Sequence, residues 1–366
     1  MKKKIIIFIP SIEDGGVEKN LFVVSNYLNS NNFSVEILTC NYDKSKNFNK
    51  GIKFIGKKNS LWQNKSRKIK YIICLKNLFL NLINRKEKPL IFAFQANIYA
   101  IIIAKLFNAK IITRSNSAPS GWSKNFIKNK FYKMMIKLAD DVMVNSLDFK
   151  KSFKKRFNIE TKCIYNPFDK DFIKRNLKKK VNEKFFFKKN YLNIISVGRL
   201  TDQKDHLTLL KAVNSLNHNF KIRLVIIGKG TMKRKLQKYI NEKKLKNKVK
   251  LIGYLKNPFP YILKSKILIL TSKFEGLPNI LLEAQYLKKY IISTNCPTGP
   301  KEILLNGKAG DLIKIGDYKK LAYLINNIHK RKKIISNKIK VGVKNFYRFD
   351  YNLNCKKYLE FVNKNI

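Results

Sequence analysis

The chain has 366 residues and carries 78 Lys and Arg side chains against 23 Asp and Glu, which gives a formal charge of +55 at pH 7. An apolar content of 45% and an aromatic content of 12% exclude an intrinsically disordered chain in spite of this charge. The length fits two domains, each able to bury a core. The five cysteines are scattered without a Cys-x-x-Cys pair, which indicates neither a zinc site nor a disulfide framework and favours a reducing compartment.

The positive charge is spread unevenly along the chain. Residues 51–139 hold 19 basic side chains and one acidic side chain, Glu87, whereas residues 251–300 hold 6 and 2. A coding bias towards lysine, which outnumbers arginine 68 to 10, would spread the excess evenly and so explains only part of it. The basic stretch therefore predicts a surface that meets an anionic partner.

No segment predicts a membrane crossing. The first residues resemble a signal peptide, but their apolar run, Ile5–Ile9, ends at Pro10 after five residues, so we expect a buried strand there. The longest uncharged apolar run, Ile98–Ala104, is far shorter than the roughly 20 residues that span a bilayer.

Short runs rich in Ile and Val alternate with longer amphipathic segments, and this alternation predicts strand-helix-strand units of a parallel sheet. The predicted strands, in chain order, are Lys4–Ile9, Ser34–Thr39, Leu90–Phe94, Lys110–Thr113, Asp141–Asn145, Leu192–Val197, Ile222–Ile227, Val249–Ile252, Ile267–Thr271 and Tyr290–Ser293. The fold class is therefore α/β, with two Rossmann-like, doubly wound domains.

The domain boundary is placed near Asn166-Pro167. The first domain spans 1–167, the charged segment 168–190 is a predicted linker, and the second domain spans 191–344. The aromatic-rich tail, 345–366, predicts a final helix that packs back toward the first domain. Two such domains facing each other imply a cleft, and ligands of open α/β sheets bind beyond the carboxyl ends of the strands.

The first candidate ligand-binding segment follows the predicted strand Leu192–Val197. A glycine turn at Gly198 leads to Arg199 and Lys204 just ahead of a predicted helix. Two cations at a strand end and near a helix amino end suit a bound diphosphate. On this segment alone, a pair of solvated basic residues is an equal alternative.

The second candidate segment holds two carboxylates, Glu275 and Glu283, on either side of a Gly-Leu-Pro turn. Pro278 suits the first turn of a helix, so we expect Glu275 in the loop and Glu283 inside the helix. The amides of Asn279 and Ile280 then become donors at a helix start, suited to an anion. The alternative makes Glu275 a cap and Glu283 a surface charge, but the scarcity of acids here favours a functional role.

These segments resemble the donor-site signature of family 4 glycosyltransferases, which have the GT-B fold and retain the configuration of the sugar. The resemblance rests on Gly198-Arg199-Leu200 with Lys204 and on the Glu-x7-Glu segment that runs from Glu275 to Glu283. It extends over nearly the whole chain, in the order of the family, through Gly15-Gly16-Val17-Glu18-Lys19, Ile227-Gly228-Lys229-Gly230, and Tyr347-Arg348-Phe349-Asp350 with Tyr358.

The resemblance implies a role for each matching position. Arg199 and Lys204 hold the nucleotide diphosphate, Glu283 binds the ribose hydroxyls and Glu275 the hydroxyls of the donor sugar, which makes Glu275, Arg199 and Lys204 the predicted catalytic residues. The other residues predicted to bind the donor are Gly15, Gly16, Gly198, Gly276, Leu277, Asn279 and Ile280. Gly15 and Gly16 let the first domain's backbone approach the phosphates.

Neither a metal nor a separate cofactor is expected, because preorganised cations and amides can stabilise the leaving diphosphate. Asp169-Lys170-Asp171 fits an Asp-x-Asp metal motif, but it lies in the predicted linker and Lys170 would oppose a cation. The sequence has no P-loop pattern, and Gly228-Lys229-Gly230 lacks the third glycine of the dinucleotide fingerprint, so kinase and dehydrogenase hypotheses lose their main support.

Two further segments concern the substrates. The loop Asn295–Leu304 resembles, within this family, enzymes that add N-acetylgalactosamine or related hexosamines and hexoses from UDP donors to lipid-linked glycans, although its prolines and glycine also suit a structural loop. On the acceptor side, many relatives place a histidine after the fourth or fifth strand of the first domain, which here has none. The resemblance to relatives with an Arg-x-Asn variant makes Arg114 and Asn116 candidates for contact with acceptor or donor phosphate. We expect His206 to be a packing or capping residue.

Two basic segments predict contact with an anionic membrane. Residues 65–88 place apolar side chains at helical spacing between cations, namely Ile69, Ile72, Leu75, Phe79 and Leu82, and residues Trp122–Leu138 mix five lysines with apolar and aromatic residues. Each Lys or Arg near such a surface contributes about 1 kcal/mol. In the alternative, most of each apolar stripe is core and only the charged flank faces lipid.

The sequence and the resemblance together predict a retaining glycosyltransferase that moves N-acetylgalactosamine, or a related hexosamine or hexose, from a UDP-sugar to a polyprenyl-diphosphate-linked saccharide. We expect a cytoplasmic protein, peripheral to the inner face of the cell membrane, with no nucleic-acid partner. The sequence indicates no oligomeric state. The alternatives are a GDP-mannose-type donor with a different acceptor and, remotely, a nucleic-acid-binding protein, which only the charge supports.

Overall fold

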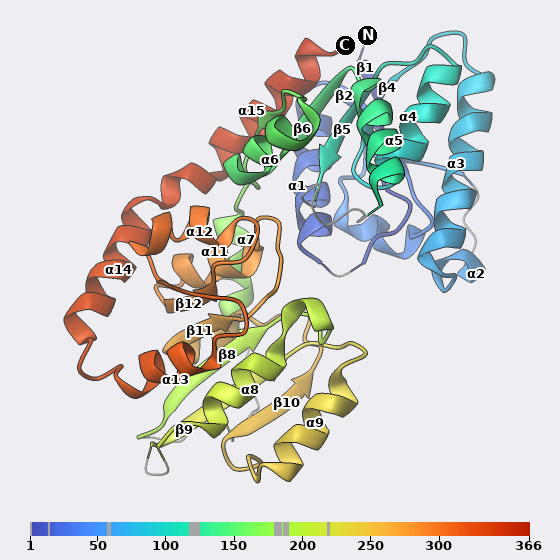
Figure 1. Cartoon of the computed structure of the whole chain (residues 1–366). Helices are drawn as coiled ribbons and strands as arrows, with labels where there is room; N and C mark the ends of the chain where they lie inside the picture. The colour runs from blue at the N-terminus through green and yellow to red at the C-terminus, as the bar shows by residue number, and fades with distance from the viewer. Residues whose placement is uncertain are drawn as a thin grey trace. The chain divides into compact units, whose positions relative to one another are not determined.

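The structure is a computed structural model that describes residues 2–13, 15–56, 60–116, 125–178, 185, 190–217 and 220–366. Its contacts divide the chain into two units. The first unit comprises Met1–Pro167 with Phe349–Ile366, and the second comprises Phe168–Arg348. Each unit is built on one sheet of parallel strands (Figure 1).

The first unit has a sheet in the order β3-β2-β1-β4-β5-β6-β7. Its strands are β1 (Lys3–Phe8), β2 (Phe33–Leu38), β3 (Lys53–Ile55), β4 (Leu90–Ala93), β5 (Ile111–Ser115), β6 (Asp141–Val144) and β7 (Lys162–Cys163). Its helices are α1 (Gly16–Ser30), α2 (Ser60–Gln63), α3 (Arg67–Ile83), α4 (Asn97–Leu106), α5 (Phe126–Lys137), α6 (Leu147–Phe157) and α15 (Tyr351–Lys364), with a 3-10 turn η1 (Tyr42–Asn47).

The central strand β1 buries both of its faces, because alternate side chains of a strand point to opposite sides of the sheet. Ile6 and Phe8 pack in one cluster with residues of α3, α4 and α6. Ile5 and Ile7 pack in the other cluster with α1 and with Tyr358 of α15. The last helix of the chain, which follows the second unit in the sequence, therefore belongs to the core of the first unit.

The second unit has a sheet in the order β10-β9-β8-β11-β12-β13. Its strands are β8 (Leu192–Val197), β9 (Ile222–Ile227), β10 (Val249–Gly253), β11 (Ile267–Leu270), β12 (Tyr290–Thr294) and β13 (Asp311–Ile313). Its helices are α7 (Lys170–Leu177), α8 (His206–Asn214), α9 (Lys233–Glu242), α10 (Phe259–Lys264), α11 (Asn279–Tyr286), α12 (Pro300–Ile303), α13 (Tyr318–Asn326) and α14 (Lys332–Lys344), with 3-10 turns η4 (Asp202–Lys204) and η5 (Leu305–Gly307). A further 3-10 turn, η6 (Phe346–Phe349), precedes α15.

The predicted α/β class and all ten predicted strands are present, most of them within one residue of the expected bounds. The sequence pattern missed β3, β7 and β13, each of two or three residues. All three lie at an edge of a sheet. Among the helices of the described residues, none has the length and apolarity to cross a bilayer.

The predicted linker, 168–190, is wrong over its first part, which forms α7. Asp169 caps this helix, since its Oδ1 accepts from the amide of Phe172 at 2.7 Å. Ile173 is buried, and the ring of Phe172 lies 6.0 Å from that of Phe259 in α10, so α7 packs as part of the second unit. Residues 179–184 and 186–189 lie outside the described residues.

Candidate active site

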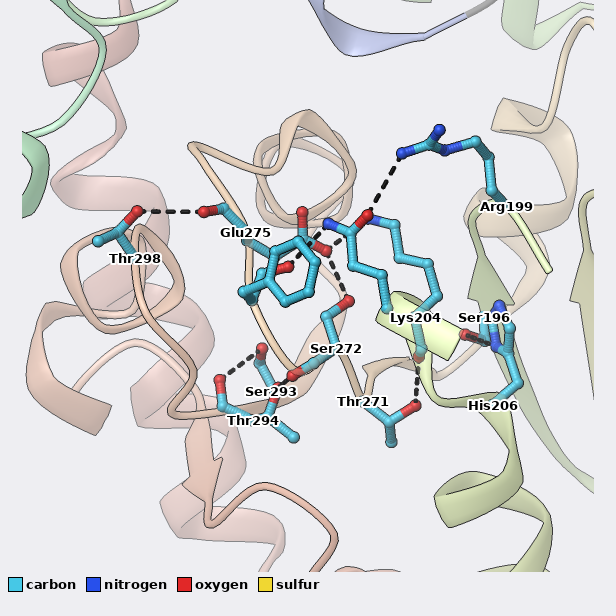
Figure 2. Close-up of polar contacts among 12 residues, drawn as sticks. Ser196, Arg199, Lys204, His206, Thr271, Ser272, Glu275, Ser293, Thr294 and Thr298 are labelled. Carbon is cyan, nitrogen blue, oxygen red and sulfur yellow. Dashed lines mark hydrogen bonds and ion pairs between the residues drawn. The ribbon is translucent and has the colours of Figure 1, made fainter. Parts of the chain in front are cut away.

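The ends of β8 and β11 bring a cation and a carboxylate together. The two strands pair in the sheet, so the loops that follow them lie at the same edge. Lys204 Nζ donates to Glu275 Oε1, and the two side chains are only 13% and 7% exposed (Figure 2). Because water screens such a pair poorly, the attraction is stronger than in an exposed ion pair.

Arg199 lies on the same loop as Lys204 but is exposed. Its guanidinium donates to Gln203 Oε1 at 3.3 Å, and Gln203 Nε2 donates to the carbonyl of Phe274 at 2.9 Å. The amide of Lys273 also donates to the carbonyl of Gln203 at 2.8 Å. Gln203 therefore ties the loop of Arg199 to the segment that carries Glu275.

Two glycines fix the path of the Gly198–Leu200 turn. A Cβ on Gly228 would lie 1.9 Å from the carbonyl oxygen of Gly198, and one on Gly230 would lie 2.3 Å from that of Leu200. The close approach is held by hydrogen bonds from Gly198 N to Ile227 O and from Leu200 N to Lys229 O, both 2.9 Å. The Gly-x-Gly segment thus packs against the backbone of the loop that carries Arg199 and holds it in place.

The loop after β12 holds the backbone of Glu275. Glu275 N donates to the carbonyl of Pro297 at 2.8 Å, and Thr298 Oγ1 donates to the carbonyl of Glu275 at 3.1 Å (Figure 2). A Cβ on Gly299, whose φ is +89°, would lie 1.8 Å from the carbonyl oxygen of Gly276. The loop to which the sequence assigned a part in donor choice therefore contacts the carboxylate segment directly.

Helix α11 places the rest of the Glu-x7-Glu segment. Glu275 lies in the loop and Glu283 inside the helix, as expected, but Pro278 stands at the N-cap rather than in the first turn. Asn279 and Ile280 begin the helix, and Glu283 is buried. The alternative that Glu283 is a surface charge is therefore wrong.

His206 is the first residue of α8 and is buried beneath this edge, so it is a packing residue as expected. Its Nδ1 lies 3.4 Å from Ser196 Oγ. Burial, together with the charge of Lys204, lowers the pKa of His206 to about 4. Asp205 caps the helix, since its Oδ1 accepts from the amide of Thr208 at 3.4 Å.

In the first unit, Gly15 is the N-cap of α1 and Gly16 its first residue. The buried carboxylate of Glu18 folds back over this helix start, where its Oε1 accepts from the amide of Glu13 at 3.3 Å. Burial raises the pKa of Glu18. A Cβ on Gly15 would lie 2.7 Å from Glu18 Oε2, so this turn is shaped around an acidic side chain.

The acceptor-side candidate Arg114 is only 1% exposed. Its Nε donates to Tyr358 Oη at 3.0 Å, its second terminal nitrogen donates to Asn166 Oδ1 at 2.8 Å, and its first donates to Asn116 Oδ1. Asn116 in turn donates to the carbonyl of Phe94 at 2.7 Å. These contacts hold β5 to α15. The predicted contact of Arg114 and Asn116 with acceptor or donor phosphate stays a prediction.

Comparisons with known proteins bear on this geometry. Residues 178–341 match the family model described as Glycosyl transferases group 1. The chain is 33% identical over 218 residues to an uncharacterized glycosyltransferase of Methanocaldococcus jannaschii, a match that covers 56% of this chain and only 53% of that protein. It is 28% identical over 274 residues to the N-acetylgalactosamine-N,N'-diacetylbacillosaminyl-diphospho-undecaprenol 4-alpha-N-acetylgalactosaminyltransferase of Campylobacter jejuni, covering 71% of this chain and 73% of that enzyme.

Solved structures extend the similarity to the whole chain. The complex of Anabaena HepE with UDP matches with a TM-score of 0.75 at 18% identity and covers 99% of this chain and 100% of that chain. A glycosyltransferase from Rickettsia africae matches with a TM-score of 0.78 at 21% identity, over 99% and 98% of the two chains. The chain has the GT-B fold of these glycosyltransferases, and its residues 178–341 match the glycosyltransferase family model. The resemblance seen in the sequence is confirmed at this level, while the number of the family, 4, stays a prediction.

The second unit gathers most of the predicted donor-site residues along one sheet edge. Gly198, Arg199 and Lys204 follow β8, and the remaining positions follow β11, namely Glu275, Gly276, Leu277, Asn279, Ile280 and Glu283. Gly15 and Gly16 belong to the first unit. Their predicted roles at the phosphates stay predictions.

The sequence did not single out Gln203, Ser272, Thr294 or Thr298, all of which hold the segment of Glu275 in place (Figure 2). For Ser272 and Gln203, the sequence offered only their positions as a sign of a role, because they lie inside the motifs that carry Glu275 and Lys204. Side chains that hold a neighbouring group through one or two hydrogen bonds leave no pattern of their own in a single sequence.

The Asp-x-Asp segment has a structural explanation. Asp169 caps α7, and Asp171 pairs with Lys174 on the exposed face of the helix at 3.4 Å. Within the part of the chain that the structure describes, no three His, Cys, Asp or Glu side chains are grouped to hold a metal ion.

Proposed function

We propose that this protein transfers a hexosamine or hexose, with N-acetylgalactosamine as the first candidate, from a UDP-sugar to a saccharide carried on a polyprenyl diphosphate, with retention of configuration. The observation that carries the donor half is the shielded pair of Lys204 and Glu275 at the ends of β8 and β11, with Arg199 on the same loop. The name of the Campylobacter enzyme, which acts on a diphospho-undecaprenol-linked saccharide, and the UDP bound to HepE support the choice of substrates.

The charge that develops on the departing UDP is what such a site must stabilise. Arg199 and Lys204 supply two cations, and each charged hydrogen bond contributes about 1.5–3 kcal/mol. Glu275 then accepts from a hydroxyl of the donor sugar and Glu283 from the ribose. The backbone around Gly198 and the start of α11 supplies further positive potential. The proposal includes no metal or separate cofactor, because these groups already provide the electrophilic assistance.

Three neighbouring helices of the first unit support a membrane-bound acceptor. In α5 the exposed apolar side chains recur at helical spacing, and α3 and α4 carry similar rows. We call this set the outer helix face, and its members are Ile69, Ile72, Phe79, Leu80 and Ile83 of α3, Tyr99, Ile102 and Leu106 of α4, and Ile127, Phe131, Met134 and Leu138 at α5. Contacts join α3 to α4 and α4 to α5 (Figure 1).

The buried side of α3 differs from the stripe expected to be core. Its buried residues are Lys70, Cys74, Leu78 and Leu82, so of the predicted stripe only Leu82 is buried. The alternative that most of the stripe is core is therefore wrong for α3. Residues 117–124, which include Trp122 and Lys124, lie outside the described residues.

Composition favours an anionic lipid surface as the partner of the outer helix face. Helices α3, α4 and α5 contain no Asp or Glu, and α5 carries four lysines beside its apolar row. Apolar side chains flanked by cations suit the boundary between head groups and acyl chains. We accordingly propose a cytoplasmic protein that is peripheral to the inner face of the cell membrane.

UDP release from a panel of UDP-sugars with lipid-linked acceptors, measured in EDTA, tests the proposed reaction. We expect turnover in EDTA and a loss of about 10- to 100-fold in kcat/KM for Arg199→Ala and for Lys204→Ala, since each variant removes a charged hydrogen bond. Lys238→Ala, which removes an exposed lysine of α9, is the matched control and should behave as the unchanged protein. Absence of both binding and turnover of any sugar nucleotide refutes the proposal.

The same assay separates the alternatives. Turnover of GDP-mannose in place of UDP-sugars would select the alternative donor. For a nucleic-acid-binding protein, Glu275→Ala would leave the only activity, affinity for polyanions, unchanged. For the proposed enzyme, it abolishes most sugar transfer without changing that affinity.

A further inference from the structure

We infer that Ser272 is a positioning residue for Glu275, one that fixes which carboxylate oxygen meets the donor sugar; this rests on the proposed function of Glu275. Ser272 lies two residues beyond the end of β11 and its side chain is fully buried. Its Oγ donates to Glu275 Oε1 at 2.6 Å (Figure 2). A hydroxyl that donates to an ionised carboxylate makes a short hydrogen bond about twice as strong as a neutral one.

Two donors converge on one oxygen of the carboxylate. Ser272 Oγ and Lys204 Nζ both donate to Glu275 Oε1. With Oε1 engaged from two directions, the rotation of the carboxylate is fixed and Oε2 is the oxygen presented to a sugar hydroxyl. In the proposed reaction the ammonium of Lys204 also serves the diphosphate, whereas the hydroxyl of Ser272 serves only the carboxylate.

Ser272 is itself held in place by the neighbouring strand. Thr294, at the end of β12, donates from Oγ1 to the carbonyl of Ser272 at 2.6 Å. The backbone of Glu275 is fixed in addition by Pro297 and Thr298, as described above. The backbone of the segment therefore does not depend on the serine hydroxyl, and its removal should free the carboxylate without displacing the loop.

The test compares Ser272→Ala with Ser293→Ala in two measurements. Ser293 is also fully buried, at the corresponding end of β12, but its Oγ donates to the carbonyl of Thr294 at 3.2 Å. For Ser272→Ala we expect a fall of about 10- to 100-fold in kcat/KM for the UDP-sugar, with the Kd for UDP alone changed less than about twofold. Ser293→Ala should leave both quantities within about twofold of the unchanged protein.

Two further variants keep the test decisive if Ser272→Ala folds poorly. Ser272→Cys, nearly equal in size but a weak donor, should show the same loss, and Ser272→Thr, which retains a hydroxyl, should recover most of the activity. Unchanged kcat/KM in both Ser272→Ala and Ser272→Cys overturns the inference, as does a parallel loss of UDP affinity, which a merely structural serine would cause. Failure of the unchanged protein to use any sugar nucleotide refutes the proposed function instead.

Discussion

Lys204 and His206 stand two residues apart, and their surroundings differ. Lys204 pairs with the carboxylate of Glu275, whereas His206 lies beneath the loop without a carboxylate among the groups that shift its pKa. Burial is the largest cause of the lowered pKa, the ammonium of Lys204 adds to it, and the carbonyls of Gly198 and Arg199 oppose it. The imidazole is therefore neutral at pH 7 and adds no charge to the candidate site.

The lowered pKa predicts a loss of stability in acid. With a pKa of about 4 in the folded protein and 6.5 in the unfolded chain, the unfolded chain binds the proton more tightly. The contribution of His206 is complete above pH 6.5 and is lost as the pH falls toward 4, by about 2 kcal/mol at pH 5. Urea unfolding at pH 7 and pH 5 should show a smaller decrease for His206→Gln than for the unchanged protein. An equal decrease in both proteins would contradict the assignment.

At the scale of elements, the sequence predicts central strands better than edge strands. Central strands such as β8 and β9 are continuous apolar runs because helices cover both of their faces, and their bounds were predicted to the residue. Edge strands such as β3 and β13 are three residues long and half-exposed, too short for a period to be visible. Their pairing is decided by the neighbouring strand rather than by their own pattern.

The buried face of an amphipathic helix is harder to predict. An apolar row indicates a covered face, but it does not show whether the protein's own core or a partner covers it. In α3 the core takes a row that includes Lys70 and Cys74, and the more apolar row is exposed. Lys70 fits there because its ammonium donates to Asn41 Oδ1 at 3.1 Å. A single sequence does not reveal such a partner, so the exposed row became apparent only in the structure.

Helix α5 gives the clearest prediction for the outer helix face. Replacing Ile127, Phe131 and Met134 with serine should lower affinity for vesicles that contain phosphatidylglycerol by at least about tenfold, because each apolar side chain that enters the interface stabilises binding. Flotation of the protein with vesicles measures this, with phosphatidylcholine vesicles and high salt as conditions that weaken binding.

The matched control for this triple variant replaces three apolar residues of the second unit that are exposed to a similar degree, Leu263, Ile315 and Ile334. These replacements should leave vesicle binding unchanged. Equal loss in the two triple variants, or no loss in either, would mean that the outer helix face is not where the protein meets lipid.

At the scale of the whole molecule, the sequence predicted the two-sheet plan and the residues that carry charge at the candidate site, while the supports of that site came from the structure. Arg199, Lys204 and Glu275 could be found because charged residues next to strand ends are visible in the sequence. The sequence does not show that Arg114 ties β5 to α15, because its partner Tyr358 lies 244 positions away in the chain. Contacts between residues so far apart leave no pattern in a single sequence.

Helix α15 follows the second unit in the sequence but packs in the first, and this packing can be tested. Tyr358 is fully buried, packs near Phe92 of β4 with ring centroids 6.4 Å apart and accepts from Arg114. Tyr358→Ala should destabilise the first unit by about 3–5 kcal/mol, as large aromatic truncations in cores do, and leave a buried guanidinium donor without its acceptor. Hydrogen exchange should therefore quicken in β1, β4 and β5 but not in β8 and β9, although α15 follows the second unit in the chain. Tyr358→Phe should lower the free energy of unfolding by about 1–3 kcal/mol, and Tyr347→Ala, at an exposed tyrosine, should leave it almost unchanged. Equal loss of exchange protection in both sheets would show that α15 does not belong to the first unit alone.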